Sequence, residues 1–182
     1  QAGYRIAKAL SEHTDNLFFA DPYLDFGVPR LLTSLRQLET YTSLTAPITF
    51  RPAAVKLIEA LHKTPIYRMG EKLIRGSLHE SVKDSHVIVG AMGDLEAFSE
   101  KELDGKTVIT SRVTESALDW FRSRKVAMVV DYSPWLEGRP VGVNVMEAMI
   151  SAALSRTPEQ LGADDFLDVI QTLGIEPRIL YP

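Results

Sequence analysis

Short apolar runs separated by amphipathic and polar stretches form the main pattern along this chain. Runs rich in β-branched and aromatic residues predict four strands. They are Asn16–Ala20, His86–Ala91, Lys106–Thr110 and Val126–Asp131. The middle of each run is apolar at both odd and even positions, which is typical of parallel strands that helices cover on both faces. The pattern therefore predicts a buried, mainly parallel sheet.

Helical patterns lie between the last three of these strands. Ser99 and Glu102 form a capping-box pattern, which predicts a short helix over about Glu100–Leu103. A second helical stripe follows it, made of Val113, Ala117, Leu118 and Phe121. Alternation of strand and helix favours right-handed crossovers and a doubly wound layer. We therefore expect an α/β fold, a Rossmann-like three-layer domain with a mainly parallel sheet.

A helical insertion of about 29–62 is expected after the first strand. Pro29 precedes one stripe of leucines, and Pro52 begins a second stripe with proline at the first helical position. Both stripes are more apolar than a simple crossover requires. They indicate either a lid or dimer contact, or extra cover for the sheet. The following segment, Thr64–Asp84, is charged and its structure is ambiguous.

Further helices are expected near the C-terminus, over about 143–174. The first covers about Val143–Ser155 and carries small side chains that allow close packing. A cap, a proline and a capping-box partner occur in order at Thr157–Gln160, which predicts the start of another helix. A last helix is expected to open at Asp164 and to end at Gly174.

The remaining segments have weaker signals. Ser133–Pro140 is predicted to be a loop from its proline and glycine content. Arg178–Tyr181 is compatible with a short edge strand or with an ordered tail. An amphipathic pattern begins almost at once, with no strand ahead of it, which suggests a fragment of a longer chain. We treat 1–182 as a single Rossmann-like domain.

Composition excludes several classes of function. The 182 residues include no cysteine, which excludes disulfides, thiol nucleophiles and zinc–thiolate sites. A net charge of −4 provides no basic field for nucleic acid or anionic lipid. No apolar run is long enough to span a bilayer, so we expect a cytoplasmic protein without a membrane partner. The four histidines are scattered, and no metal is expected.

Polar residues follow each predicted strand. In an open α/β sheet, ligands bind beyond the carboxyl ends of the strands. The loops at those ends begin near Asp21, Gly90, Thr110 and Asp131. If the strands are parallel, these loops share one edge and form a polar site for a small molecule. The alternative is that the Asp, Ser, Pro and Gly residues simply make turns.

Two of these loops resemble parts of a nucleotide site. Gly90 and Gly93 follow a strand directly, and such a turn lets backbone N–H groups approach a phosphate. The acid that would hold the ribose of NAD is absent, and Ser111 and Arg112 stand in its place. Arg112 therefore favours the 2′-phosphate of NADP, with NAD the less favoured cofactor. The alternative for Arg112 is a solvated surface charge.

A second candidate anion site lies at the start of the predicted helix near 143. Arg139 could bind a carboxylate or phosphate there with two hydrogen bonds, beside free N–H groups and Asn144. Tyr132 and Trp135 could stack on a flat ligand. The alternative is that Asn144 caps the helix and Trp135 fills a hydrophobic gap.

Four segments of the sequence together resemble a known family. They are Phe19–Pro29, Lys106–Glu115, Trp135–Arg139 and Gly142–Ala148. They resemble the C-terminal part of bacterial quinate (shikimate-type) 5-dehydrogenases, and the likeness runs from about residue 16 to the end. The resemblance implies oxidation of a cyclohexane alcohol at the expense of NAD(P). It also implies that the segment Ser111–Thr114 holds the 2′-phosphate of NADP, as an Asn-Arg-Thr motif does in those enzymes.

These inferences lead to an α/β domain that binds a polar or phosphorylated small molecule. If hydride transfer occurs, Asp131 and Tyr132 are the expected proton acceptors. The expected substrate contacts are Asp21, Arg139 and Asn144. The alternative is a non-catalytic ligand-sensing or dimerisation module, in which the apolar face of Pro29–Leu61 contacts a second copy.

Overall fold

The computed structural model describes residues 2–26, 28, 30–49 and 76–182. The chain divides into two compact units, residues 1–84 and residues 85–182. We call them the helical unit and the sheet unit, and describe each by itself. The single domain expected over 1–182 stays a prediction.

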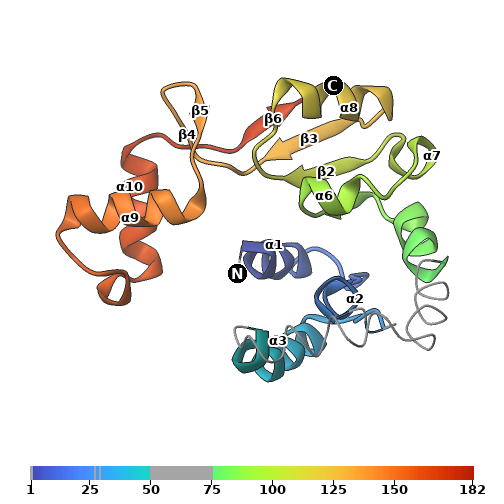
Figure 1. Cartoon of the computed structure of the whole chain (residues 1–182), viewed down its shortest axis with the longest axis horizontal. Coiled ribbons are helices and arrows are strands. Elements are labelled where there is room, and N and C mark those ends of the chain that lie inside the picture. The colour runs from blue at the N-terminus through green and yellow to red at the C-terminus, as the bar shows by residue number, and fades with distance from the viewer. Residues whose placement is uncertain (1, 27, 29, 50–75) are drawn as a thin grey trace. The chain divides into compact units, whose positions relative to one another are not determined.

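The sheet unit contains a four-stranded sheet. Its strands are β1 (Val87–Val89), β2 (Thr107–Thr110), β3 (Met128–Asp131) and β6 (Arg178–Leu180). Their order is β1-β2-β3-β6, with β1, β2 and β3 parallel and β6 antiparallel to β3. Figure 1 labels β2, β3 and β6 of this sheet. This order confirms the mainly parallel sheet of an α/β protein. The segment Arg178–Tyr181, which the sequence left open between an edge strand and an ordered tail, contains the edge strand β6.

Short helices connect the parallel strands: α6 (Met92–Leu95), α7 (Glu100–Leu103) and α8 (Glu115–Ser123). The capping box before α7 is confirmed, because Ser99 donates from its N–H (2.8 Å) and its hydroxyl (2.6 Å) to Glu102 Oε2. Thr114 caps α8, where its hydroxyl accepts from Ala117 N–H at 3.2 Å. The core of this unit includes Leu95, Leu103, Val108, Phe121 and Val129.

Two expectations about the sheet are corrected. Burial alternates along β1, where Ile88 is buried while Val87 and Val89 are 40% and 38% exposed, so cover on both faces was wrong for this strand. The strand order also advances in one direction, without the reversal that defines a doubly wound sheet. The run expected as the first strand does not pair with β1 in the described residues.

The segment after β3 was expected to be a loop and is a tight hairpin instead. Strand β4 (Trp135–Leu136) pairs antiparallel with β5 (Arg139–Pro140). The two residues between them, Glu137 and Gly138, have φ angles of 50° and 75°. Two successive positive φ angles are the signature of a type I′ turn, whose twist matches that of the strands it joins.

The C-terminal helices are α9 (Val143–Leu154), the 3₁₀ turn η1 (Pro158–Gln160) and α10 (Ala163–Thr172). The N-cap of α9 is Gly142, so Asn144 lies inside the first turn and does not cap the helix. The signals at Thr157 produce only the single turn η1. Gly174, with a φ of 62°, follows the end of α10 as expected.

The helical unit contains α1 (Ala2–Ser11), α2 (Asp21–Phe26) and α3 (Leu35–Thr49), and residues 76–84 are also helical. Its core gathers Ala7 of α1, Leu32 and Leu38, against which Tyr4, Phe19, Leu35 and Tyr41 pack. The helix 76–84 settles the last part of the charged segment that the sequence left ambiguous.

The first predicted strand was wrong. Within Asn16–Ala20, only Phe19 makes a β-bridge, an isolated antiparallel one with Leu32. The run cannot extend because α2 begins at the next residue, Asp21, with Pro22 inside its first turn. A short apolar run does not by itself distinguish a strand from a buried connection.

The first leucine stripe also differs from the prediction. The helix starts at Leu35, after Ser34 accepts a hydrogen bond from Gln37 N–H at 3.3 Å. Leu32 and Leu38 are buried in the core of the helical unit, and the dimer contact expected over Pro29–Leu61 stays a prediction. The helix predicted to start at Pro52 lies outside the described residues.

Candidate functional site

Three of the four expected loops lie at one edge of the sheet. Because β1, β2 and β3 are parallel and in register, their carboxyl ends bring Gly90, Ser111 and Tyr132 into neighbouring positions. Backbone hydrogen bonds tie these exits together: Gly90 N–H donates to Ile109 O at 3.2 Å, and Tyr132 N–H donates to Thr110 O at 3.0 Å. Polar residues from three connections therefore meet at this edge.

Asp21 belongs to the helical unit, where it is the first residue of α2. Burial is the main cause that raises the pKa of its carboxyl group. Tyr41 donates its hydroxyl to Asp25 Oδ2 at 2.9 Å in the same region. Asp21 does not follow a strand of the sheet, and its role in binding a substrate stays a prediction.

The glycine loop lacks the conformation that would demand glycine. Neither Gly90 nor Gly93 has a positive φ angle. A Cβ atom at Gly90 would be in ordinary contact with Leu95 (3.6 Å), and one at Gly93 would meet nothing within 4 Å. Helix α6 after the loop has only four residues. The geometry therefore gives no specific support to the cofactor-binding role predicted for the two glycines.

Asp131, at the end of β3, is the centre of the strongest polar network at this edge. Its side chain is fully buried, and each carboxylate oxygen accepts two hydrogen bonds. Oδ1 accepts from the N–H groups of Arg112 (3.1 Å) and Ser133 (3.0 Å). Oδ2 accepts from Val113 N–H (3.2 Å) and from Trp135 Nε1 (3.0 Å). Four donors occupy the lone pairs of a carboxylate, which favours a positioning role.

A cation also faces this carboxylate from the C-terminal strand. Arg178 Nη1 lies 4.0 Å from Asp131 Oδ2, and the Arg178 guanidinium stacks on the ring of Trp135 at 3.8 Å from its centroid. The register places Thr110, Asp131 and Arg178 in one row across β2, β3 and β6. One face of Trp135, predicted to stack on a ligand, is thus covered by Arg178.

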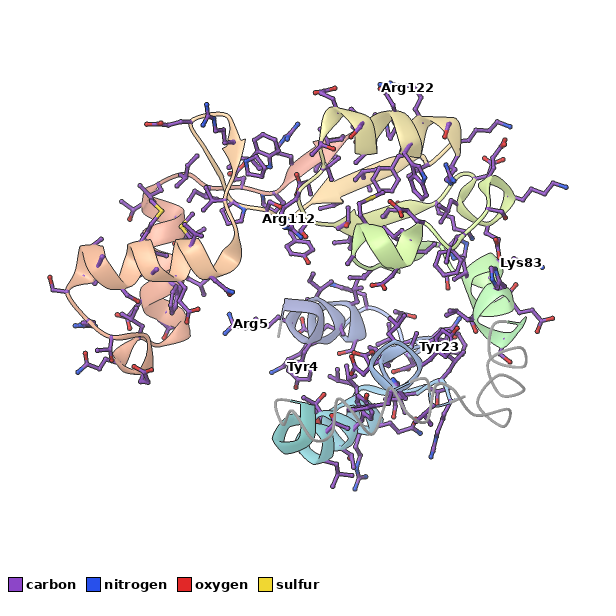
Figure 2. The ribbon with its side chains drawn as sticks, in the orientation of Figure 1. Tyr4, Arg5, Tyr23, Lys83, Arg112 and Arg122 are labelled. Atoms are coloured by element: carbon purple, nitrogen blue, oxygen red, sulfur yellow. The ribbon has the colours of Figure 1, made fainter. Side chains whose placement is uncertain are left out.

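Arg112 has the most unusual backbone of the predicted site residues. Its φ angle is 56°, in the left-handed region that residues other than glycine seldom adopt. Its N–H donates to Asp131 Oδ1 and also to the hydroxyl of Ser133. Its side chain is exposed in the loop that follows β2 (Figure 2), and it forms no ion pair within the described parts of the chain. The loop therefore presents a free guanidinium at the edge.

The other residues predicted here have different surroundings. Thr114 is occupied by its capping bond to α8 and by a 3.0 Å hydrogen bond to Ser116. Ser111 and Tyr132 are half-buried. Arg139 is exposed on β5 and Asn144 is exposed in α9. Their catalytic, cofactor and substrate roles stay predictions.

Sequence reasoning placed Ser133 in the loop after the last predicted strand without a contact to Asp131, and it missed Arg178. The Ser133 N–H bond to Asp131 is an Asx turn, and the Asp-x-Ser spacing could have indicated it. No local signal connects Arg178 to Asp131, because only the pairing of β6 with β3 brings them together. Two buried atoms at this edge, Thr110 Oγ1 and Arg178 Nη1, have no hydrogen-bond partner among the described residues.

No group of three or more His, Asp or Glu side chains in the described residues is arranged to hold a metal ion. No helix among them combines the length and apolar character needed to cross a bilayer.

The fold and this edge define a mixed α/β protein with a polar loop cluster at the carboxyl ends of parallel strands. The chain belongs to the family described as a domain of unknown function (DUF8754), whose model matches residues 1–182 and so spans both units. Comparison with curated proteins and with solved structures gave no match. The findings support this family alone, and the resemblance to quinate 5-dehydrogenases stays a prediction.

Proposed function

We propose that this protein binds a small anionic molecule at the carboxyl edge of its sheet, with Arg112 as the main contact. The phosphate of a nucleotide is the ligand chemistry that fits best, and NADP is the specific candidate. The observation that carries the proposal is the left-handed backbone of Arg112, which two acceptors hold while the guanidinium stays exposed and unpaired in the described structure.

Strained backbone conformations of this kind persist only where the surroundings enforce them, and they are concentrated at functional sites. A guanidinium can form two parallel hydrogen bonds to a phosphate, which gives both affinity and orientation. The position of Arg112 directly after the second parallel strand is also where an arginine accommodates the 2′-phosphate of NADP in dinucleotide-binding sheets. NAD lacks this phosphate and is the disfavoured cofactor.

The proposal concerns binding and stops short of hydride transfer. A bound NADP would supply the hydride chemistry itself. On the side of the protein, the oxygens of Asp131 are already occupied by four donors, so this carboxylate has no lone pair directed at a substrate hydroxyl. The quinate-type dehydrogenase activity is therefore the finer form of the proposal, to be tested only after binding.

Isothermal calorimetry with NADP, NAD and inorganic phosphate tests the proposal. We expect saturable binding of NADP that weakens at least about tenfold in Arg112→Ala, a loss of about 1.4 kcal/mol. NAD should bind the wild-type protein about as weakly as NADP binds the variant. Arg122→Ala is the matched control, since Arg122 is an exposed arginine on α8 whose ion pair is with Asp119 (Figure 2).

The proposal fails if NADP and phosphate give no heat at millimolar concentration. It fails equally if Arg112→Ala and Arg122→Ala bind NADP as the wild-type protein does. Weakening by both variants to the same extent would indicate a general charge effect and would also refute a specific role for Arg112.

A further inference from the structure

We infer that Asp131 is a positioning residue, which creates the anion site by holding the Arg112 loop from the buried side. This inference rests on the proposed function, because it explains how the guanidinium of Arg112 is presented. It assigns Asp131 a role different from that of a proton acceptor.

The loop wraps around the carboxylate in the manner that loops wrap around a bound anion. Two successive N–H groups, those of Arg112 and Val113, point at the two oxygens of Asp131, at 3.1 Å and 3.2 Å. Concave pairs of backbone N–H groups are known to bind anions. Here a side chain of the protein fills the concavity, so the backbone can turn left-handed at Arg112 and send its side chain outward.

The carboxylate itself is held rigidly from the opposite side. Trp135 donates its indole N–H to Oδ2, and Arg178 of β6 lies over the Trp135 ring with Nη1 4.0 Å from the same oxygen. A buried carboxylate is costly unless hydrogen bonds and a counter-charge compensate it, and this network provides both. The C-terminal strand and the hairpin therefore support the geometry of the Arg112 loop.

The charge and the symmetry of the carboxylate are both needed for this role. In Asp131→Asn, one of the two oxygens becomes an NH₂ group that faces N–H donors. Either the Arg112 and Ser133 N–H groups or the Val113 and Trp135 N–H groups then lose their acceptor. We expect the left-handed turn at Arg112 to relax, because the side chains at positions 131 and 133 no longer hold the Arg112 N–H group together.

Hydrogen exchange measured by NMR tests the positioning directly and needs no ligand. The Arg112 and Val113 amides should exchange slowly in the wild-type protein and at least about tenfold faster in Asp131→Asn, while the amide of Val108 within β2 is unchanged. Equal protection in the two proteins would overturn the inference. Ser133→Ala, which removes only the second acceptor of Arg112 N–H, should give a smaller increase at Arg112 and serves if Asp131→Asn does not fold.

A double-mutant cycle with NADP as the probe connects this positioning to binding. We expect Asp131→Asn to weaken NADP at least about fivefold in the wild-type background and to have no further effect in Arg112→Ala. An equal loss in both backgrounds would mean that Asp131 acts through general folding, which would refute the inference. Thr110→Val is the matched control, because it changes a buried neighbour in the same row whose hydroxyl has no partner in the described structure.

Failure of the proposed function has a different signature. If Arg112→Ala leaves NADP binding unchanged, the anion site is wrong, and the hydrogen-exchange result still decides whether Asp131 holds the loop. If Arg112→Ala weakens binding but Asp131→Asn does not, the site is retained and the positioning role is refuted.

Discussion

Replacing Arg112 by glycine should give a more stable protein than replacing it by alanine, while both changes destroy the anion site. Arg112 has a φ angle of 56°, and a left-handed conformation costs an L-residue with a Cβ atom roughly 1–2 kcal/mol. Glycine avoids this cost but loses about 0.5–1 kcal/mol through the greater freedom of the unfolded chain. The net gain of Arg112→Gly over Arg112→Ala is therefore about 0.7 kcal/mol in the free energy of unfolding, the middle of a range of roughly 0–1.5 kcal/mol.

Urea unfolding followed by circular dichroism measures this difference. With a slope of about 2 kcal/mol/M, the midpoint for Arg112→Gly should lie roughly 0.3–0.5 M above that of Arg112→Ala. NADP binding should be weak in both variants. The comparison with alanine matters, because both variants lack the guanidinium and differ only in backbone freedom.

Ser155→Gly is the matched control. Ser155 follows α9 with a φ angle of 52° and is exposed, so glycine there should give a similar gain without any change in NADP binding. The reasoning is refuted if Arg112→Gly is no more stable than Arg112→Ala while Ser155→Gly is stabilised. Such a result would mean that the arginine occupies its conformation without strain.

Three further predictions concern stability. Phe121→Ala should lower the free energy of unfolding by about 3–5 kcal/mol in urea titrations, because Phe121 is completely buried, and a loss below about 1 kcal/mol would contradict its place in the core. Gly138→Ala should cost about 1 kcal/mol, since Gly138 has a φ of 75° in the hairpin turn, and an unchanged urea midpoint would argue against that turn. Asp21→Asn should stabilise the protein at pH 7 but not at pH 3, as measured by urea unfolding at both pH values. Burial raises the folded-state pKa of Asp21 above its usual value of 3.8, so the wild-type protein loses stability as pH rises from that value through the folded pKa, and a pH-independent difference would contradict this cause.

The local elements of the sheet unit could be predicted well from sequence. Three strands and the helix after Ser99 follow from β-branched runs and a capping box, signals that depend on residues only a few positions apart. The hairpin was missed although Glu137-Gly138 lies between its strands, because the neighbouring prolines favoured a loop. The run Asn16–Ala20 was misread because its apolar content suits either a strand or a buried connection.

The candidate site was predictable only in part. Parallel strands were enough to bring Gly90, Ser111 and Asp131 to one edge, and Arg112 was identified from its position after β2. The sequence did not reveal that Arg112 has a left-handed backbone. It also did not reveal which groups surround the Asp131 carboxylate.

The sequence by itself determined the three parallel strands, the helix after Ser99 and the absence of cysteine chemistry. Only the tertiary structure decided that Asp131 is enclosed by donors from the Arg112 loop, from the hairpin and, across the sheet, by the cation of Arg178. The physical reason is the distance along the chain over which each kind of interaction acts. Propensity and capping act between near neighbours along the chain, whereas the environment of a buried charge depends on strand register and on loops that meet only after the chain has folded.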